Sequence, residues 1–516
     1  MRGGRAALLL ESKGREGWQA LTSSADMSLL TLPEPDAAVL ARRDEIIRQL
    51  KKLVVAPGLI VDREGCQTFE TDALTAYRCI PLAVVLPAST EEVSRVLRFC
   101  HDTKLKVVPR GAGTSLCGGA LPLEDAIVLG ISRMSKVLAI DVTNRAARVE
   151  AGVTNIAISN AVAAEGFFYA PDPSSQLACT LGGNIAMNAG GAHCLKYGVT
   201  TNNVLGLRVV LMNGEIVEIG GDHLDAAGYD FLGLIIGSEG QLGIVTEATV
   251  RLLKAPEGAR PMLLGFSSSE AAGACVAAII AAGIIPVALE FMDRPAIHVC
   301  ENFAHAGYPL AEEALLIVEV EGSEDEIDNL LATITEIAQD YAPLVIRISQ
   351  SAAESARIWK GRKAAFGAFG QISDYYCMDG VIPLSRLPEA LAEVRQICKR
   401  YRFDVANVFH AGDGNLHPLI LYNANDRAEL ERAELCGAEI LKLCVKLGGC
   451  LTGEHGVGIE KRELMRVQFT AADIVQQMRV KTAFDPHWLL NPAKVFPLEG
   501  RWMTVHCASA SGPIPG

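Results

Sequence analysis

Three glycine-rich segments constrain the fold of this chain most; the first follows an apolar run that predicts a β-strand, and the third precedes another. Residues 107–119 read VVPRGAGTSLCGG, residues 180–191 read TLGGNIAMNAGG, and residues 236–247 read IGSEGQLGIVTE. Glycines let backbone N–H groups approach an anion closely, and a run of small residues lets a flat ligand lie on the backbone. The first segment alone is equally typical of an ordinary turn. All three together favour a ligand site.

Two common phosphate-binding motifs are excluded for the first segment. Leu116 stands where a dinucleotide-binding fingerprint requires its third glycine, and no Gly-Lys-Ser/Thr follows as in a P-loop. The net charge of −13 argues against non-specific binding to nucleic acid. No apolar run reaches the ~18 residues of a membrane helix. None of the 14 cysteines forms a C-x-x-C pair, so we expect mostly buried thiols in a reducing compartment.

The length of 516 residues predicts two or three domains at roughly 150 residues per domain. We expect an N-terminal extension at 1–29, dispensable rather than a secretory signal or transit peptide, a first domain at 30–255, a second at 262–497 and a loose tail at 498–516. In the first domain we predict helices at 36–53 and 90–103, the latter opened by a capping box at 89–92. Asn213-Gly214 predicts a type I′ hairpin, and 254–261 a linker. In the second domain, repeated β-α-β alternation predicts a split α+β sheet.

A second group of motifs lies near the C-terminus. His410 and His417 flank turn-forming residues in FHAGDGNLHP, which predicts a hairpin with one histidine at the end of each arm. Glu454 follows later in GEHGVG, and two His with one Glu suit Zn²⁺ or Mn²⁺. A lone histidine is more often a satisfied core or surface residue, but two glycine-flanked motifs in one domain favour a site. On spacing alone, Arg362 belongs to a solvated basic helix face.

The order and spacing of the three glycine segments resemble the FAD-binding domain of the vanillyl-alcohol oxidase/PCMH flavoprotein family, over about residues 80–255. The resemblance implies that the first segment holds the pyrophosphate and that the other two line the ribityl chain and isoalloxazine. No histidine lies in the first segment, so noncovalent FAD is expected. The implied FAD-binding residues are Pro109, Arg110, Gly111, Ala112, Gly113, Thr114, Ser115, Gly118, Gly119, Pro171, Asp172, Ser174, Ser175, Gly182, Gly183, Asn184, Asn188, Gly190, Gly191, Tyr197, Gly198, Glu239, Gly243, Ile244, Val245 and Asn491.

The C-terminal motifs resemble the FAD-linked oxidase C-terminal domain of D-2-hydroxy-acid dehydrogenases. The resemblance implies a divalent metal on His410, His417 and Glu454. It also implies His455 as the catalytic base and Arg362 as the group that grips the substrate carboxylate. Cys377 departs from the pattern, because relatives acting on dicarboxylates have a lysine there. That difference favours a smaller, monocarboxylate substrate.

The sequence therefore predicts an α+β protein with a two-subdomain PCMH-type FAD domain, a ferredoxin-like substrate domain and a C-terminal helical segment. The expected reaction is FAD-dependent dehydrogenation of a small 2-hydroxy acid, glycolate first. A D-lactate (or other D-2-hydroxy-acid) dehydrogenase and a noncatalytic flavin-binding subunit are the alternatives, and a colourless nucleotide-binding regulator is more remote. The resemblance implies a second flavin-domain subunit, an iron–sulfur subunit and quinone as the final acceptor. It implies a cytoplasmic location, with peripheral attachment at the inner membrane face.

Overall fold

The computed structural model describes residues 30, 32–223 and 228–498. The predicted extension at 1–29 lies outside the described residues, as does the predicted tail apart from Leu498. The predicted first helix is present but is interrupted at Arg42, giving α2 (Ala37–Ala41) and α3 (Arg43–Leu53). The short helix α4 spans Arg63–Gln67.

A small mixed sheet opens the first domain, in the order β1-β2-β4-β3. Strands β2, β4 and β3 are parallel, and β1 pairs antiparallel with β2. Parallel neighbours need a crossover, which α5 provides between β2 and β3. The bounds are Leu59–Ile60 (β1), Ala83–Val85 (β2), Thr90–Thr103 (α5), Lys106–Arg110 (β3) and Ala126–Gly130 (β4).

Helix α5 starts where predicted, but its capping box is only half formed. Ser89 Oγ accepts the N–H of Glu92 at 3.3 Å. The Glu92 carboxylate accepts the N–H groups of Ala88 (2.8 Å) and Val55 (3.0 Å), not that of Ser89. Glu92 thus ties the helix start to the preceding loop as well as capping it.

An antiparallel sheet in the order β5-β6-β10-β8-β9 completes the first domain. Its bounds are Val137–Asp141, Ala146–Glu150, Ile244–Arg251, Val204–Val210 and Ile216–Gly220, in that order. The predicted β8–β9 hairpin is confirmed, but its type I′ turn is wrong. A type I′ turn needs positive φ at both central residues, whereas Asn213 is not in that region and Gly214 has φ 83°. Gly214 N–H donates to Leu211 O at 2.8 Å.

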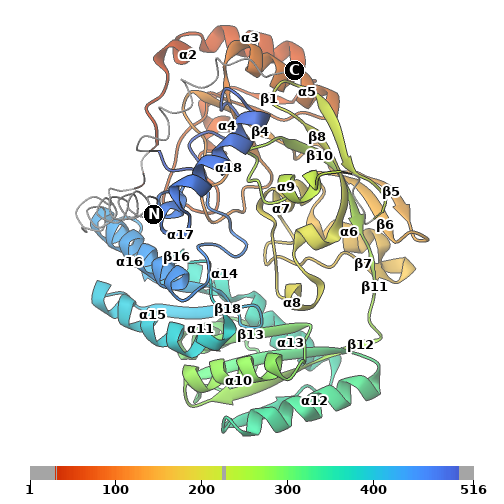
Figure 1. Cartoon of the computed structure of the whole chain (residues 1–516), viewed down its shortest axis with the longest axis vertical. Helices are drawn as coiled ribbons and strands as arrows, with labels where there is room; N and C mark the ends of the chain where they lie inside the picture. The colour runs from red at the N-terminus through yellow and green to blue at the C-terminus, as the bar shows by residue number, and fades with distance from the viewer. Residues whose placement is uncertain (1–29, 31, 224–227, 499–516) are drawn as a thin grey trace, which may run out of the picture. The chain divides into compact units, whose positions relative to one another are not determined.

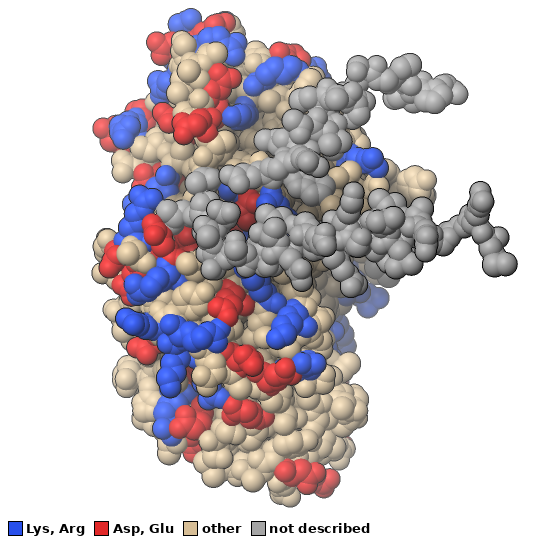
Figure 2. Space-filling view, turned by 60° about the vertical axis from the view of Figure 1, so that its left-hand side comes forward, with Lys and Arg blue, Asp and Glu red and all other residues tan. Residues whose placement is uncertain are grey.

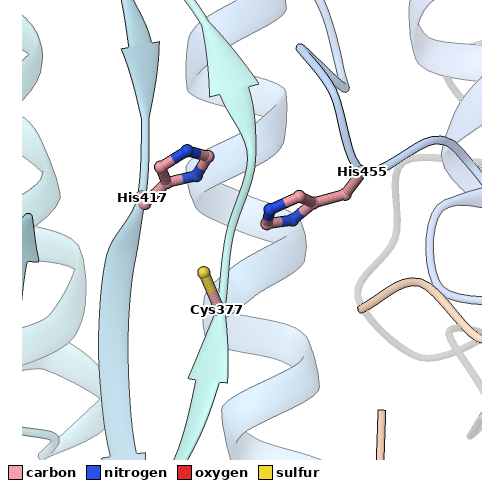
Figure 3. Close-up of side chains that lie close together, drawn as sticks. All are labelled: Cys377, His417 and His455. Carbon is pink, nitrogen blue, oxygen red and sulfur yellow. The ribbon is translucent and has the colours of Figure 1, made fainter. Parts of the chain in front are cut away.

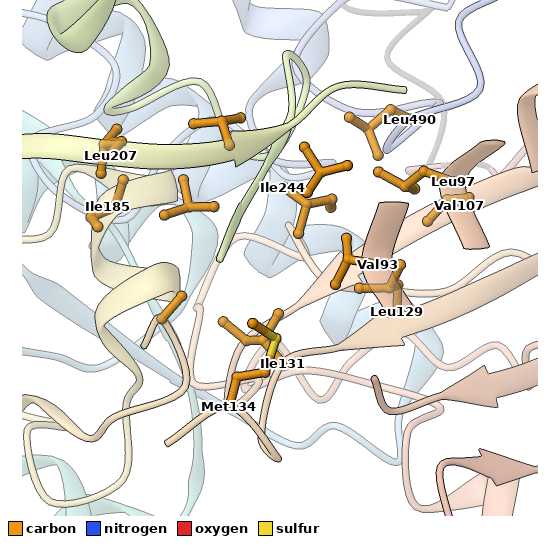
Figure 4. Close-up of a cluster of buried hydrophobic side chains, with 14 of the residues drawn as sticks. Val93, Leu97, Val107, Leu129, Ile131, Met134, Ile185, Leu207, Ile244 and Leu490 are labelled. Carbon is orange, nitrogen blue, oxygen red and sulfur yellow. The ribbon is translucent and has the colours of Figure 1, made fainter. Parts of the chain in front are cut away.

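One hydrophobic core joins the two sheets of the first domain (Figure 4). Val93 and Leu97 of α5 meet Val107 and Leu129 of the first sheet and Ile244 of the second, all buried. Ile185 of α7 (Leu181–Met187) extends this core under the second glycine segment. The glycine segments therefore rest on tightly packed elements.

The second domain is built on a nine-stranded sheet whose main path is β15-β12-β14-β13-β18-β19-β17, with β20 joining β18 to β16. The strands are Gly258–Phe266 (β12), Ala288–Asp293 (β13), Ala314–Gly322 (β14), Val345–Ile348 (β15), Asp374–Cys377 (β16), Gly380–Val381 (β17), Val405–His410 (β18), Asn415–Leu416 (β19) and Pro418–Tyr422 (β20). Strand β12 begins inside the predicted linker, because residues from Gly258 onward pair with β14. The split α+β prediction is otherwise confirmed.

Helices cover both faces of this sheet (Figure 1). Alternate strand residues such as Leu263, Leu315 and Ile317 pack on α11, α13 and α14, and α10 packs on β12 and β14 together with α12. The helices are Ser269–Ala281 (α10), Arg294–Ala304 (α11), Glu324–Gln339 (α12), Ala352–Lys363 (α13), Ala365–Gly370 (α14), Leu387–Tyr401 (α15) and Arg427–Lys446 (α16).

The C-terminal segment returns to the first domain after α18 (Ala471–Phe484). Val107 of β3 donates to Leu489 O at 2.8 Å, and Asn491 N–H donates to Val107 O at 2.7 Å. The end of the described chain is thus tied to the strand that leads into the first glycine segment.

The distribution of charged side chains and the state of the cysteines agree with what the composition predicts. On the face shown in Figure 2, Lys and Arg side chains are interspersed with Asp and Glu. Within the described ranges, every cysteine is a free thiol and all but Cys79 and Cys450 are buried, as predicted; Cys507 lies outside them. No helix among the described residues is long and apolar enough to cross a membrane.

We predict that Leu97→Ala lowers the melting temperature, because Leu97 is fully buried in the first core. Truncating a buried leucine costs about 2–5 kcal/mol. The matched control is Leu344→Ala, whose side chain is 59% exposed, and it should leave melting near wild type. Circular dichroism melts of the three proteins make the comparison. Equal melting temperatures would contradict the assigned core.

Candidate active site

One cavity runs between the two domains, and all three glycine segments line it. The first segment contributes residues from Pro109 to Gly119, the second from Thr180 to Ala189, and the third from Ser238 to Val245. At its other end the same cavity is lined by Phe366, Tyr375, His410, His417, Glu454 and His455. The two motif groups that the sequence analysis identified separately therefore share one site.

Close packing explains why the first two segments are rich in glycine. A Cβ placed on Gly111 would lie 2.5 Å from Thr180 Oγ1 and 3.3 Å from the Cα of Gly183. A Cβ on Gly182 would lie 2.6 Å from Ile131 Cδ1. The two segments therefore meet backbone to backbone, and only glycine allows that approach.

Most residues predicted to bind the cofactor line this cavity. Those that do not are Gly118, Pro171, Asp172, Asn188, Gly190, Gly191, Tyr197 and Gly198. Several of these have other partners: Asp172 pairs with His193, Gly190 N–H donates to Glu454, and Tyr197 OH contacts Glu321. Lining residues that the sequence analysis missed include Leu116, Ile131, Pro173, Met187, Phe366 and Tyr375, none of which carries a charge.

Two buried side-chain amide groups at the flavin end of the cavity have atoms that could bind a polar cofactor. Asn184 Nδ2 and Asn491 Oδ1 are buried and find no hydrogen-bond partner among the described residues, although both side chains line the cavity. Such groups are costly unless something pairs with them. A cofactor that carries both donors and acceptors satisfies this requirement, as FAD does.

At the other end, His410, His417 and Glu454 converge on one point. The Nε2 atoms of His410 and His417 lie 3.4 Å and 3.1 Å from Glu454 Oε1. The three ligating atoms lie within 4.8 Å of one another. Ligands of a divalent metal at bond lengths of about 2.0–2.2 Å have that spacing. The predicted hairpin is confirmed: His410 ends β18, and His417 lies between β19 and β20.

Both histidines are oriented by a second partner on their other ring nitrogen. His410 Nδ1 lies 2.8 Å from Glu290 Oε1, and His417 Nδ1 lies 3.2 Å from Met378 O. This arrangement directs both Nε2 atoms to the same point, as second partners do in metal sites. Glu290 is fully buried in β13 and was missed in the sequence analysis because an apolar strand surrounds it.

Arg362 is buried on α13 rather than part of a solvated helix face. Its Nη2 lies 2.6 Å from Glu290 Oε2, so a chain of contacts runs from Arg362 through Glu290 to His410. The guanidinium is 4% exposed and does not line the cavity. Its Nε has no hydrogen-bond partner among the described residues.

A second group of potential ligands shares His417. Cys377, His417 and His455 also bring ligating atoms within 4.8 Å, and their side chains face one another (Figure 3). Burial raises the pKa of the Cys377 thiol well above its ordinary value, so the thiol stays protonated. A metal binds the thiolate, so the group with Glu454 is the stronger candidate.

The carboxylate of Asp379 fixes the loop that carries Glu454 and His455. It accepts the backbone N–H groups of Gly453 (3.1 Å), Glu454 (3.2 Å) and His455 (2.9 Å), and Lys461 Nζ lies 3.5 Å away. Burial raises the pKa of Asp379, but the cationic neighbours outweigh burial and lower it to about 2. Asp379 is therefore an anion that holds the loop at neutral pH.

The pKa values of His455 and His410 are shifted in opposite directions. Burial lowers the pKa of His455 to about 4, and Asp379 opposes this only in part. Burial also lowers the pKa of His410, but the carboxylates of Glu290 and Glu454 outweigh it and raise that pKa well above the ordinary value. Burial raises the pKa of Glu454, and hydrogen bonds from both histidines more than reverse the effect. His455 can thus accept a proton, beside a carboxylate that attracts cations.

Comparison with known proteins agrees with this geometry. The FAD binding domain family matches residues 81–220, and the family of FAD linked oxidases, C-terminal domain, matches residues 255–495. Glycolate oxidase subunit GlcD of Escherichia coli (strain K12) is 48% identical over 88% of this chain and 91% of its own length. A D-lactate dehydrogenase of Anaerostipes hadrus is 30% identical over 87% of this chain and 97% of its own.

The fold is also that of a solved structure. The crystal structure of p-cresol methylhydroxylase with substrate bound superposes with a TM-score of 0.75 at 16% identity, covering 90% of this chain and 98% of that one. The predicted PCMH-type fold is confirmed, and FAD is the cofactor of its first domain. The chain therefore belongs to the FAD-linked oxidases, the oxidoreductase family that includes glycolate oxidase subunit GlcD.

Proposed function

We propose that the chain is the catalytic flavoprotein subunit of a glycolate oxidase, which converts glycolate to glyoxylate. The single observation that carries the proposal is the shared cavity, because it places the FAD segments and the His–Glu cluster around one space. The similarity to GlcD over most of both chains supports glycolate as the substrate. The intact cluster argues against the noncatalytic alternative.

In the proposed reaction, His410, His417 and Glu454 hold a divalent cation, which when bound polarises the substrate hydroxyl. His455 Nδ1 is buried without a hydrogen-bond partner among the described residues, so a ring nitrogen is free to accept the hydroxyl proton. The glycine segments would hold FAD, which would supply the acceptor for the α-hydrogen leaving as a hydride. We keep for Arg362 the substrate-carboxylate role that the family resemblance implies; its guanidinium pairs with Glu290 behind the cavity wall, and its Nε is unpaired among the described residues.

The cavity wall favours a small substrate. Phe366 and Tyr375 line the substrate end, with their ring centroids 6.1 Å apart, and the Phe366 ring lies 6.4 Å from that of His417. Cys377, buried beside them, supplies no cation for a second carboxylate. D-Lactate adds only one methyl group to glycolate, so the similarity to a D-lactate dehydrogenase keeps that acid as the second candidate.

We also propose the assembly that the family resemblance implies. The relative in Escherichia coli is named as a subunit, which supports a complex for this chain too. A second flavin-domain subunit and an iron–sulfur subunit would then pass electrons to quinone. The location at the inner face of the cytoplasmic membrane stays a prediction.

The test of the proposal is anaerobic flavin reduction. We expect glycolate to bleach the flavin band near 450 nm faster than D-lactate does, and L-lactate and D-2-hydroxyglutarate to bleach it little. Chelation and Glu454→Gln should each remove bound metal and slow bleaching, while the exposed-site control Glu393→Gln keeps both. If none of the acids bleaches a yellow protein, even with partner subunits co-expressed, the catalytic proposal fails.

We predict that Gly111→Ala loses flavin, because its new Cβ would lie 2.5 Å from Thr180 Oγ1 and separate the first two glycine segments. Gly367→Ala is the matched control, since nothing lies within 4 Å of a Cβ there. Absorbance at 450 nm per mole of purified protein gives the flavin content. Equal flavin content in the two variants would place the cofactor elsewhere.

We predict that the rate of flavin reduction does not fall between pH 8 and 5.5 when metal is saturating. His455, with a pKa of about 4, stays neutral over this range and loses its function as a base only as the pH falls towards 4. His455→Asn should slow reduction by about 100-fold or more, and His298→Asn, at a half-buried histidine outside the cavity, should not. A decline centred near pH 6.5 in the wild type, abolished in His455→Asn, would contradict the assigned environment.

A further inference from the structure

A short segment of the flavin domain contacts the substrate domain at points outside the cavity. Helix α8 (Cys194–Tyr197) and the preceding His193 meet two acidic residues of β14, Glu319 and Glu321. Lys196 Nζ lies 2.8 Å from Glu321 Oε1, and Tyr197 OH contacts the same carboxylate. We call His193, Lys196, Tyr197, Glu319 and Glu321 the α8 clasp.

His193 is the centre of the clasp because it lies between two carboxylates from different domains. Its Nδ1 lies 2.9 Å from Asp172 Oδ2 in the flavin domain, and its Nε2 lies 3.5 Å from Glu319 Oε2 in the substrate domain. Burial lowers the pKa of His193, but the two carboxylates outweigh it and raise the pKa to about 10. At neutral pH the ring is therefore a cation shared by both domains.

The two carboxylates beside His193 are each connected, through the chain or through paired strands, to residues of the candidate active site. Asp172 precedes Ser174 and Ser175, which line the flavin end of the cavity. On the other side, β14 pairs with β13, whose Glu290 is in register with His410 of β18. Strands paired in this way move together, so a shift at Glu319 is passed to the His–Glu cluster.

Trp359 adds a third connection. Its Nε1 donates to Glu319 Oε1 at 2.7 Å, and its ring packs edge-on against His193 with centroids 5.7 Å apart. Trp359 lies on α13 one turn before Arg362. The clasp therefore fixes the helix that carries the proposed carboxylate-binding arginine, in addition to the sheet.

We propose that His193 is a positioning residue that sets the substrate domain over the flavin by bridging Asp172 and Glu319. The expected slowing of flavin reduction rests on the proposed function, in which glycolate is the substrate. Without the imidazolium, two largely buried carboxylates from opposite domains would face each other and repel. Hydride transfer is sensitive to that displacement, because a 1 Å misplacement can cost about 100-fold in rate.

The kinetic test uses rapid-mixing reduction of the full-length holoprotein by glycolate. We expect His193→Ala to reduce its flavin at least about tenfold more slowly, with flavin content near wild type and a lower melting temperature that Glu319→Gln partly restores. His298→Gln, at a half-buried histidine of α11 outside the cavity, is the matched control and should keep the wild-type rate. A wild-type rate in His193→Ala, or a loss that only parallels flavin loss, would overturn the proposal.

A double variant distinguishes this charge bridge from general destabilisation. Glu319→Gln removes one of the two repelling carboxylates, so His193→Ala/Glu319→Gln should reduce its flavin faster than His193→Ala alone. Two independent structural losses would instead multiply, making the double variant slower than either single variant. That result would overturn the bridge.

Hydrogen exchange tests the clasp without any substrate. We expect His193→Ala to speed amide exchange in α8 and at the end of β14, and unchanged exchange in both would overturn the clasp. If wild-type flavin is reduced by none of the 2-hydroxy acids, the proposed function fails, and the exchange data still decide whether the clasp joins the domains.

Discussion

The site depends on the contacts of the Glu454 carboxylate, because this group of the substrate domain binds residues of both domains. Its Oε2 accepts the N–H of Gly190 from the second glycine segment at 3.1 Å, while its Oε1 faces His410 and His417. A Cβ on Gly190 would lie 2.9 Å from that Oε2. Gly190, which the family resemblance assigned to the cofactor, thus contacts the Glu454 carboxylate at the substrate end. This contact helps to fix the flavin end and the substrate end of the cavity relative to each other.

Buried charge shapes the rest of the site, since an ion taken out of water needs a partner. The contacts run as an alternating series from Arg362 to Glu290, His410 and Glu454, and Asp379 balances Lys461 on the loop behind. Each member orients the next, which fixes the rotamers of the histidines that line the cavity. A divalent cation that binds to this series of charged groups would displace protons as well as water, so its affinity should depend on pH.

Local patterns allowed the hairpin of His410 and His417, the start of α5 and the β-α-β order to be predicted, because turn chemistry and periodicity act over a few residues. Glu290 and the role of Asp379 could not be found this way. Glu290 lies in an apolar strand and meets a partner 120 residues away. Tyr197 was assigned to FAD by resemblance, but its hydroxyl contacts Glu321 of the other domain. What the sequence could not reveal were contacts between residues far apart in the chain, within a domain as well as between domains.

The two ends of the cavity recognise their ligands by different means, and this difference explains how one fold can serve several acids. Backbone groups and small side chains form the flavin end, where packing such as that of Gly111 on Thr180 tolerates little change. Side chains on separate strands and helices form the substrate end, where Phe366 and Tyr375 line the cavity. Substrate choice is then set in the second domain alone. The flavin that accepts the hydride stays with the first, provided that contacts such as those of Glu454 keep the domains in register.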